Sequence, residues 1–170
     1  MRSRKPFFNT ILGVVVAAGC SDVTSAPEPR NAPIQTAQVA NLSAGNCASP
    51  TKVNASAVIG KNGGVLEIGP HRLEIPKGAL TSTVTITAKT GDKNLGNAVK
   101  FGPEGLRFRT YAVLTMNMSN CTGWGWYKVP QIVYTDELLR ILEVQPSDPD
   151  FQSKTVTGYL THFSRYAVAY

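Results

Sequence analysis

Apolar and polar side chains alternate with a period of two in several stretches of the chain. The apolar members of three such stretches are Val84, Ile86 and Ala88; Leu106 and Phe108; and Leu114, Met116 and Met118. The residues between them are Thr, Arg or Asn. Because successive side chains of a β-strand point to opposite faces of a sheet, this period predicts strands with one buried face and one exposed face.

Segments rich in glycine and proline separate these stretches. The predicted turns are residues 60–64, 69–70, 76–78, 91–94, 102–105 and 146–149. Glycine adopts the positive φ values that tight turns need, and proline fixes φ at a value that turns favour. Many short strands separated by such turns predict an all-β fold, specifically an antiparallel β-sandwich.

Residues 135–144 fit two interpretations. Three leucines after Thr135 have helical spacing, and the Thr135 side chain is a suitable cap for a helix. Ile141 and Val144 suit a strand instead. We favour a pair of strands over a short helix.

The N-terminal residues have the layout of a secretory signal peptide, which we place at residues 1–19. Three basic residues precede a mostly apolar run from Phe7 to Val16, and this run is too short to span a bilayer by itself. Residues 17–20, Ala-Ala-Gly-Cys, resemble the lipobox of bacterial lipoproteins, in which the thiol of the Cys receives a diacylglyceryl group and the Cys becomes the new N-terminus.

The lipobox resemblance implies that Cys20 is lipidated and that the protein is anchored to a membrane of the bacterial cell envelope. Ser21 follows the Cys, and by the enterobacterial rule this residue favours the outer membrane. The alternatives are secretion without a lipid and a buried N-terminal helix with Cys20 in the core.

A flexible tether is predicted at residues 20–51, and one domain at residues 52–170. The tether segment contains four prolines and no aromatic residue, so it cannot bury enough apolar surface to offset the entropy of ordering. The whole chain is 42% hydrophobic, too high for a wholly disordered protein. No stretch reaches the roughly 20 apolar residues of a spanning helix, which excludes a polytopic membrane protein.

The basic charge does not indicate a nucleic-acid partner. The formal net charge of +6 falls to +3 without residues 1–19, because that segment holds three basic residues and no acidic one. The remaining 14 basic and 11 acidic residues are spread along the chain without a cluster. A phosphate-binding surface needs clustered Lys and Arg, so we expect no nucleic acid among the partners.

Cys47 and Cys121 remain once Cys20 carries a lipid. An even number of cysteines in an exported protein predicts a disulfide between them. The alternative is two separate thiols, one of them in the flexible tether.

Four segments together resemble the ZU-five domain, known from zonula occludens proteins, netrin receptors and ankyrins, with simpler versions in bacterial extracytoplasmic proteins. They are Val-Ile-Gly at 58–60 with Gly-Gly-Val-Leu at 63–66; Leu-Glu-Ile-Pro-Lys-Gly-Ala-Leu at 73–80; Phe-Gly-Pro-Glu-Gly-Leu-Arg-Phe at 101–108; and His-Phe-Ser-Arg-Tyr-Ala-Val at 162–168. The resemblance implies a β-sandwich that acts in protein interaction. We therefore expect a non-catalytic interaction or structural module whose partner is an envelope protein or polysaccharide.

The resemblance also implies a chemical hypothesis at residues 162–164. Some ZU-five relatives in death-domain and inflammasome proteins cut their own chain between the Phe and Ser of this tripeptide. Here Ser164 would be the nucleophile, His162 the base, and the bond between Phe163 and Ser164 the one that breaks. The alternative is that Phe163 is simply a core residue of the final strand.

Other candidate chemistry is sparse. Trp124, Trp126 and Tyr127 form an aromatic cluster that we expect to pack in the core; facing outward, the two tryptophans would instead form a sugar-stacking or protein-docking surface. The chain has two histidines, His71 and His162, and no metal-site spacing, nucleophile elbow or phosphate-binding glycine loop. We expect no metal, no cofactor and no conventional enzyme activity.

Overall fold

The computed structural model describes residues 41–48, 52–91 and 97–170, and this part of the chain contains no helix. Accordingly, no helix among these residues is long and apolar enough to cross a membrane. The strands are β1 Asn46–Cys47, β2 Asn54–Ile59, β3 Gly64–Ile68, β4 His71–Ile75, β5 Val84–Thr90, β6 Ala98–Gly102, β7 Arg107–Asn117, β8 Cys121–Thr122, β9 Gln131–Thr135, β10 Ile141–Val144, β11 Ser147–Asp150, β12 Thr155–His162 and β13 Arg165–Ala169.

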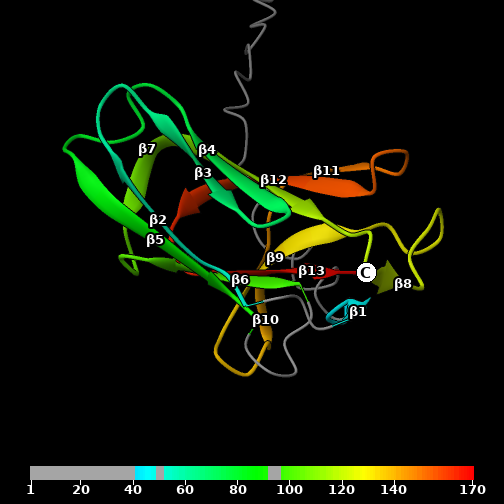
Figure 1. The fold of residues 1–170 in the computed structure, drawn as a ribbon. Helices are drawn as coiled ribbons and strands as arrows, with labels where there is room; N and C mark the ends of the chain where they lie inside the picture. The colour runs from blue at the N-terminus through cyan, green and yellow to red at the C-terminus, as the bar shows by residue number, and fades with distance from the viewer. Residues whose placement is uncertain (1–40, 49–51, 92–96) are drawn as a thin grey trace, which may run out of the picture. The chain divides into compact units, whose positions relative to one another are not determined.

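Two antiparallel sheets pack against each other, which confirms the predicted β-sandwich (Figure 1). The larger sheet has six strands in the order β10-β9-β13-β6-β5-β2, and the smaller has five in the order β11-β12-β7-β4-β3. A separate short pair joins β1 to β8.

The predicted alternation places the expected side chains in the core between the sheets. Ile86 and Ala88 of β5 are buried while Thr85 and Thr87 are exposed, and Leu114 and Met116 of β7 are fully buried. Residues 135–144 form no helix; they contain the end of β9, a turn and β10, which pairs with β9. β9 ends at Thr135, and Leu139, at φ 59°, lies in the turn that leads to β10.

Strand β13 is buried on both faces. Tyr166 and Val168 belong to the main core, whereas Ala167 and Ala169 belong to a second apolar cluster on the outer face of the larger sheet, together with Leu42 and other residues. β9 and β6 pair with the two edges of β13, and because apolar clusters cover both faces, each of its five residues is buried.

Residues 41–48 are part of this fold, although the sequence placed them in the flexible tether. The backbone N–H of Gly45 donates to the carbonyl of Val168 at 2.9 Å, and the N–H of Tyr170 donates to the carbonyl of Ser43 at 3.1 Å. The predicted signal peptide, Cys20 and the rest of the predicted tether lie outside the described residues.

The predicted disulfide between Cys47 and Cys121 is present and joins β1 to β8. It links residues 74 positions apart in the sequence. The side-chain amide of Asn97 lies 3.2 Å from the Cys121 Sγ atom and also donates to the carbonyl of Asn117 at 2.6 Å. The disulfide therefore links residues 41–48 to Cys121, a residue of the main core cluster.

His71 gives the fold a predictable pH dependence. Its side chain is 1% exposed, Nδ1 accepts a hydrogen bond from the Asn117 N–H at 3.1 Å, and burial lowers its pKa from 6.5 to about 4. Between these two pH values the unfolded chain binds a proton that the folded chain does not. We expect the free energy of unfolding to fall by roughly 3 kcal/mol as pH drops from 6.5 to 4, with no further loss from His71 below that.

Urea unfolding at pH 7 and pH 4.5 measures this effect. The control is His71→Asn, whose side-chain oxygen can still accept the Asn117 N–H. The part of the pH dependence due to His71 should disappear in this variant, and an identical pH dependence in both proteins would contradict the assignment.

Candidate functional site

The aromatic cluster of the sequence lies in the loop between β8 and β9. Gly123, at φ 88°, turns the chain away at the end of β8, and the backbone of Gly125 pairs with that of Lys128. The Trp124 ring is held by a hydrogen bond from Nε1 to the carbonyl of Cys121 at 3.1 Å. Its ring also stacks on Phe151, from the turn between β11 and β12, with the centroids 5.8 Å apart.

Trp126 and Tyr127 are exposed, so core packing was a wrong expectation for these two residues. The Trp126 side chain is 82% exposed and Tyr127 103%, whereas Trp124 packs partly against the core as expected. The physical reason is that β8 ends at Thr122, so the two tryptophans lie in a turn rather than on a strand. The Trp126 ring covers Phe151, with centroids 4.9 Å apart.

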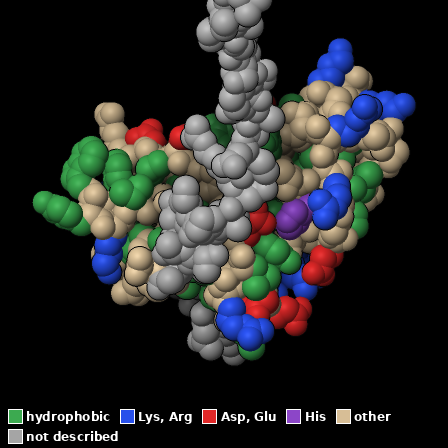
Figure 2. Space-filling view, turned by 180° about the vertical axis from the view of Figure 1, so that it is seen from behind, with side chains coloured by type: hydrophobic (Ala, Val, Ile, Leu, Met, Phe, Trp, Pro, Cys, Tyr) green, Lys and Arg blue, Asp and Glu red, His purple; other side chains and the backbone are tan. Residues whose placement is uncertain are grey.

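We call Trp124, Trp126, Tyr127 and Phe151 the aromatic patch. Figure 2 shows hydrophobic side chains gathered at its left edge, at the end of the molecule where Figure 1 places β8. Cys121 belongs to the disulfide, and the Trp124 ring donates a hydrogen bond to the Cys121 carbonyl. The loop that presents Trp126 is therefore attached to the core at its base.

The tripeptide at 162–164 forms the junction between β12 and β13. The Phe163 side chain is fully buried, stacks on Phe101 with centroids 5.0 Å apart, and meets Phe108 edge to face with centroids 4.8 Å apart. Its carbonyl oxygen accepts a hydrogen bond from the Gly105 N–H at 3.0 Å, and the Ser164 carbonyl accepts one from the Phe101 N–H at 2.9 Å. Phe163 is therefore the core residue that the alternative interpretation expected.

His162 lies beside the Phe163 carbonyl. Its Nδ1 atom is 3.4 Å from the Phe163 oxygen, and among the described residues no hydrogen bond joins His162 to the Ser164 hydroxyl. The Tyr166 hydroxyl donates to the His162 carbonyl at 2.7 Å, and burial, followed by the negative charge of Glu143, raises the pKa of Tyr166 well above its usual range. In this geometry Nδ1 can donate to the Phe163 carbonyl only in the tautomer that carries a proton on Nδ1.

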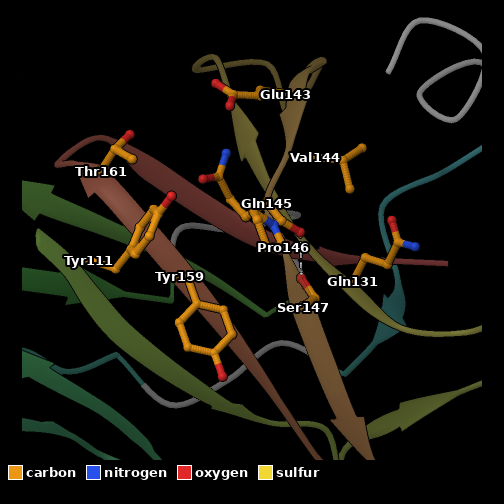
Figure 3. A pocket seen from close by; sticks show the side chains of 9 residues that line it. All are labelled: Tyr111, Gln131, Glu143, Val144, Gln145, Pro146, Ser147, Tyr159 and Thr161. Atoms are coloured by element: carbon orange, nitrogen blue, oxygen red, sulfur yellow. Dashed lines mark hydrogen bonds between the residues drawn. The ribbon is translucent and has the colours of Figure 1, made fainter. Parts of the chain in front are cut away.

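A hollow of the described surface was not foreseen from the sequence (Figure 3). It has a volume of about 390 Å³ and takes residues from β7, β9, β10, β11 and β12. Tyr111, Gln145 and Tyr159 line it. They come from three separate segments, and no motif or spacing in the sequence links them.

Metal-ligating side chains do not gather in the described residues. No group of three or more His, Cys, Asp or Glu side chains there is suitably placed to hold a metal ion. His71 is buried near β7, and His162 lies at the end of β12.

The four segments that resemble the ZU-five domain meet in two pairs. The Gly78 N–H donates to the carbonyl of Lys61 at 2.8 Å, which joins the turn after β4 to the turn between β2 and β3. The bonds from Gly105 and Phe101 join 101–108 to the junction at Phe163 and Ser164. No family model matches the chain, and no curated protein matches it either. The ZU-five resemblance therefore stays a prediction based on these segments.

Proposed function

We propose that this protein is a lipoprotein of the bacterial cell envelope, anchored through Cys20 and built on a ZU-five-type domain, which acts as a non-catalytic protein-interaction module. The anchor would be in the outer membrane, with the domain outside the cytoplasm. The observation that supports an interaction role is the exposure of Trp126 and Tyr127.

Exposed aromatic side chains on a fixed loop favour binding of another protein. Tyr and Trp are enriched among the residues that contribute most to protein interfaces, because they bury much area and lose little side-chain entropy. The hydrogen bond of Trp124 and the contact of Trp126 with Phe151 hold the patch in place before binding. A pre-organised patch loses less entropy when the partner docks.

The test is the double substitution Trp126→Ala and Tyr127→Ala in the full chain, expressed in its native envelope. We expect the melting temperature to change little, because both side chains are exposed. A photo-crosslinking residue at position 127 should form one discrete protein adduct. The adduct should disappear when Trp126→Ala is added. The lipid anchor is tested separately, because Cys20→Ser should release the protein from the membrane fraction.

Leu138 provides the matched control, since its side chain is 76% exposed and it lies in the turn between β9 and β10. The same photo-crosslinker at position 138 should give no such adduct. Equal adducts at 127 and 138, or none at 127, would contradict docking at the aromatic patch. Retention on cell-wall polysaccharide that Trp126→Ala abolishes would favour the carbohydrate-binding alternative that uses Trp124 and Trp126.

A second candidate function is self-cleavage between Phe163 and Ser164, and the donors around the Phe163 carbonyl favour it. Negative charge develops on that oxygen when a nucleophile attacks, and the Gly105 N–H and, in one tautomer, the His162 Nδ1–H would stabilise it. Ser164 also borders a hollow of about 160 Å³, through which water can approach.

The cleavage would proceed in two steps, formation of an ester and its hydrolysis. The Ser164 hydroxyl oxygen would bond to the carbonyl carbon of Phe163, the peptide C–N bond would break, and the hydroxyl proton would pass to the Ser164 amine. Water would then hydrolyse the ester, leaving a carboxylate on Phe163 and restoring the hydroxyl.

Mass spectrometry under denaturing conditions tests this function, because a cleaved β13 would stay in the sheet of the native protein. The expected product is a fragment beginning at Ser164, absent from Ser164→Ala and still formed by Ser164→Cys, which keeps a nucleophile. A wild-type protein that stays intact after prolonged incubation would exclude self-cleavage.

A further inference from the structure

The hollow of Figure 3 lies where the two sheets meet at one edge. Gln131 comes from β9 and Glu143 from β10 in the larger sheet, whereas Tyr111 comes from β7 and Tyr159 from β12 in the smaller sheet. Gln145 lies on the link between β10 and β11, where the chain passes from one sheet to the other. The volume of the hollow, about 390 Å³, lies within the roughly 300–1,000 Å³ typical of small-molecule sites.

Two amide side chains lining this hollow hold buried polar atoms without a hydrogen-bond partner in the described structure. They are the Nε2 donor of Gln145, a residue only 3% exposed, and the Oε1 acceptor of Gln131. Figure 3 shows the Gln145 side chain extending toward the space between Thr161 and Glu143. An unpaired buried polar group costs about 1–3 kcal/mol, so a ligand toward which both amide side chains turn recovers this energy.

Two tyrosines give the same hollow an aromatic wall. Tyr111 is 53% exposed and meets Tyr159 edge to face, with centroids 6.4 Å apart. The Tyr159 hydroxyl donates to Asp148 Oδ2 at 2.8 Å, which fixes the ring against which Tyr111 rests. An aromatic face beside hydrogen-bonding amides suits a ligand with an aliphatic face and hydroxyl groups at its edge.

The charge of the lining restricts the ligand further. Among the described residues that line this hollow, Glu143 is the one that is charged, and none is Lys or Arg. An anionic ligand such as a phosphate or an acidic sugar would therefore meet a like charge and no cation. Hydroxyl groups both donate and accept hydrogen bonds, so they match one free donor and one free acceptor.

We propose that this hollow is a binding site for one uncharged sugar residue of a glycan. The sugar ring packs its C–H face on Tyr111, its hydroxyl groups pair with Gln145 and Gln131, and Glu143 accepts from a further hydroxyl. This site is separate from the aromatic patch and does not depend on the docking of a protein there.

The test uses the full-length protein purified in detergent. Its probes are soluble tetrasaccharides of glucose, of N-acetylglucosamine and of galacturonic acid, the last being anionic. We expect at least one of the two neutral probes to bind in calorimetry and to shift the side-chain amide NMR signals of Gln145. The galacturonic acid probe should do neither at the same millimolar concentration.

Two variants locate the binding. Gln145→Met keeps nearly the same side-chain volume and removes the unpaired amide, so it should fold at least as stably while weakening binding at least about tenfold. Tyr111→Ala removes an exposed ring and should weaken binding by a similar factor. The control is Trp126→Ala, which should leave sugar binding unchanged and is also the variant that tests the docking proposal.

The results separate the two proposals. Binding of no neutral probe, or equal binding by the wild type and Gln145→Met, overturns the sugar site. Sugar binding that Trp126→Ala abolishes and Tyr111→Ala leaves intact also overturns it, because the sugar would then lie on the aromatic patch.

Discussion

Removing the disulfide with the double substitution Cys47→Ala and Cys121→Ala should lower the free energy of unfolding by about 4 kcal/mol. The bond closes a loop of 74 positions, and without it the unfolded chain gains the entropy that this closure removes. For a domain of this size the melting temperature should fall by roughly 10–20 °C. Urea unfolding of the oxidised protein, the reduced protein and the double variant measures the difference.

The double variant and the reduced wild type should agree, because both lack the same constraint. The loop that carries the aromatic patch begins directly after Cys121 and β8. A change in the environment of its aromatic side chains would therefore show that removing the disulfide alters the folded structure as well. A loss below about 1 kcal/mol would show that the pairing of β1 with β8 already fixes these residues, and that the unfolded chain is not much restricted by the bond.

Phe163→Ala should destabilise the fold by about 3–5 kcal/mol. The ring is 0% exposed and lies between Phe101 and Phe108, so alanine leaves a cavity that both sheets border. The backbone around it is also fixed, by the bonds that Gly105 donates to Phe163 and Phe163 donates to Leu106 at 2.7 Å. Such bonds limit how far the surroundings can collapse into the cavity.

Phe163→Leu is the matched control, because leucine fills most of the same space and should cost only about 1–2 kcal/mol. Denaturant unfolding of the wild type and both variants measures the two losses of stability. All three proteins also carry Ser164→Ala, so that self-cleavage cannot contribute. Equal losses for alanine and leucine would contradict a packing role and would point to the stacking geometry of the ring with Phe101.

The strands were predictable because a half-buried strand alternates apolar and polar residues in its own sequence. The apolar positions 84, 86 and 88 face the core and their polar neighbours face water, so local alternation identifies β5 without knowledge of its partners. The disulfide was predictable from the two cysteines that remain once Cys20 is assigned to the lipid anchor.

Features that depend on distant partners were not predictable in this way. The residues of 41–48 do not reveal their partners, because their place depends on hydrogen bonds with Val168 and Tyr170 at the other end of the domain sequence. The exposure of Trp126 depends on the end of β8 and the turn at Gly123 rather than on the tryptophan itself. The hollow of Figure 3 needs Tyr111 and Gln145 together, and only the sheet topology brings them side by side.

Strand β13 is the last of the described strands along the chain, yet it lies in the middle of the larger sheet, between β9 and β6. During synthesis, the other described strands emerge from the ribosome before the one that joins these two halves. Until residues 165–169 arrive, β9 and β6 each present an open edge to which another chain can add. A nascent chain therefore cannot complete this sheet early, and a premature stop before Arg165 should yield a product that aggregates instead of a slightly shortened domain.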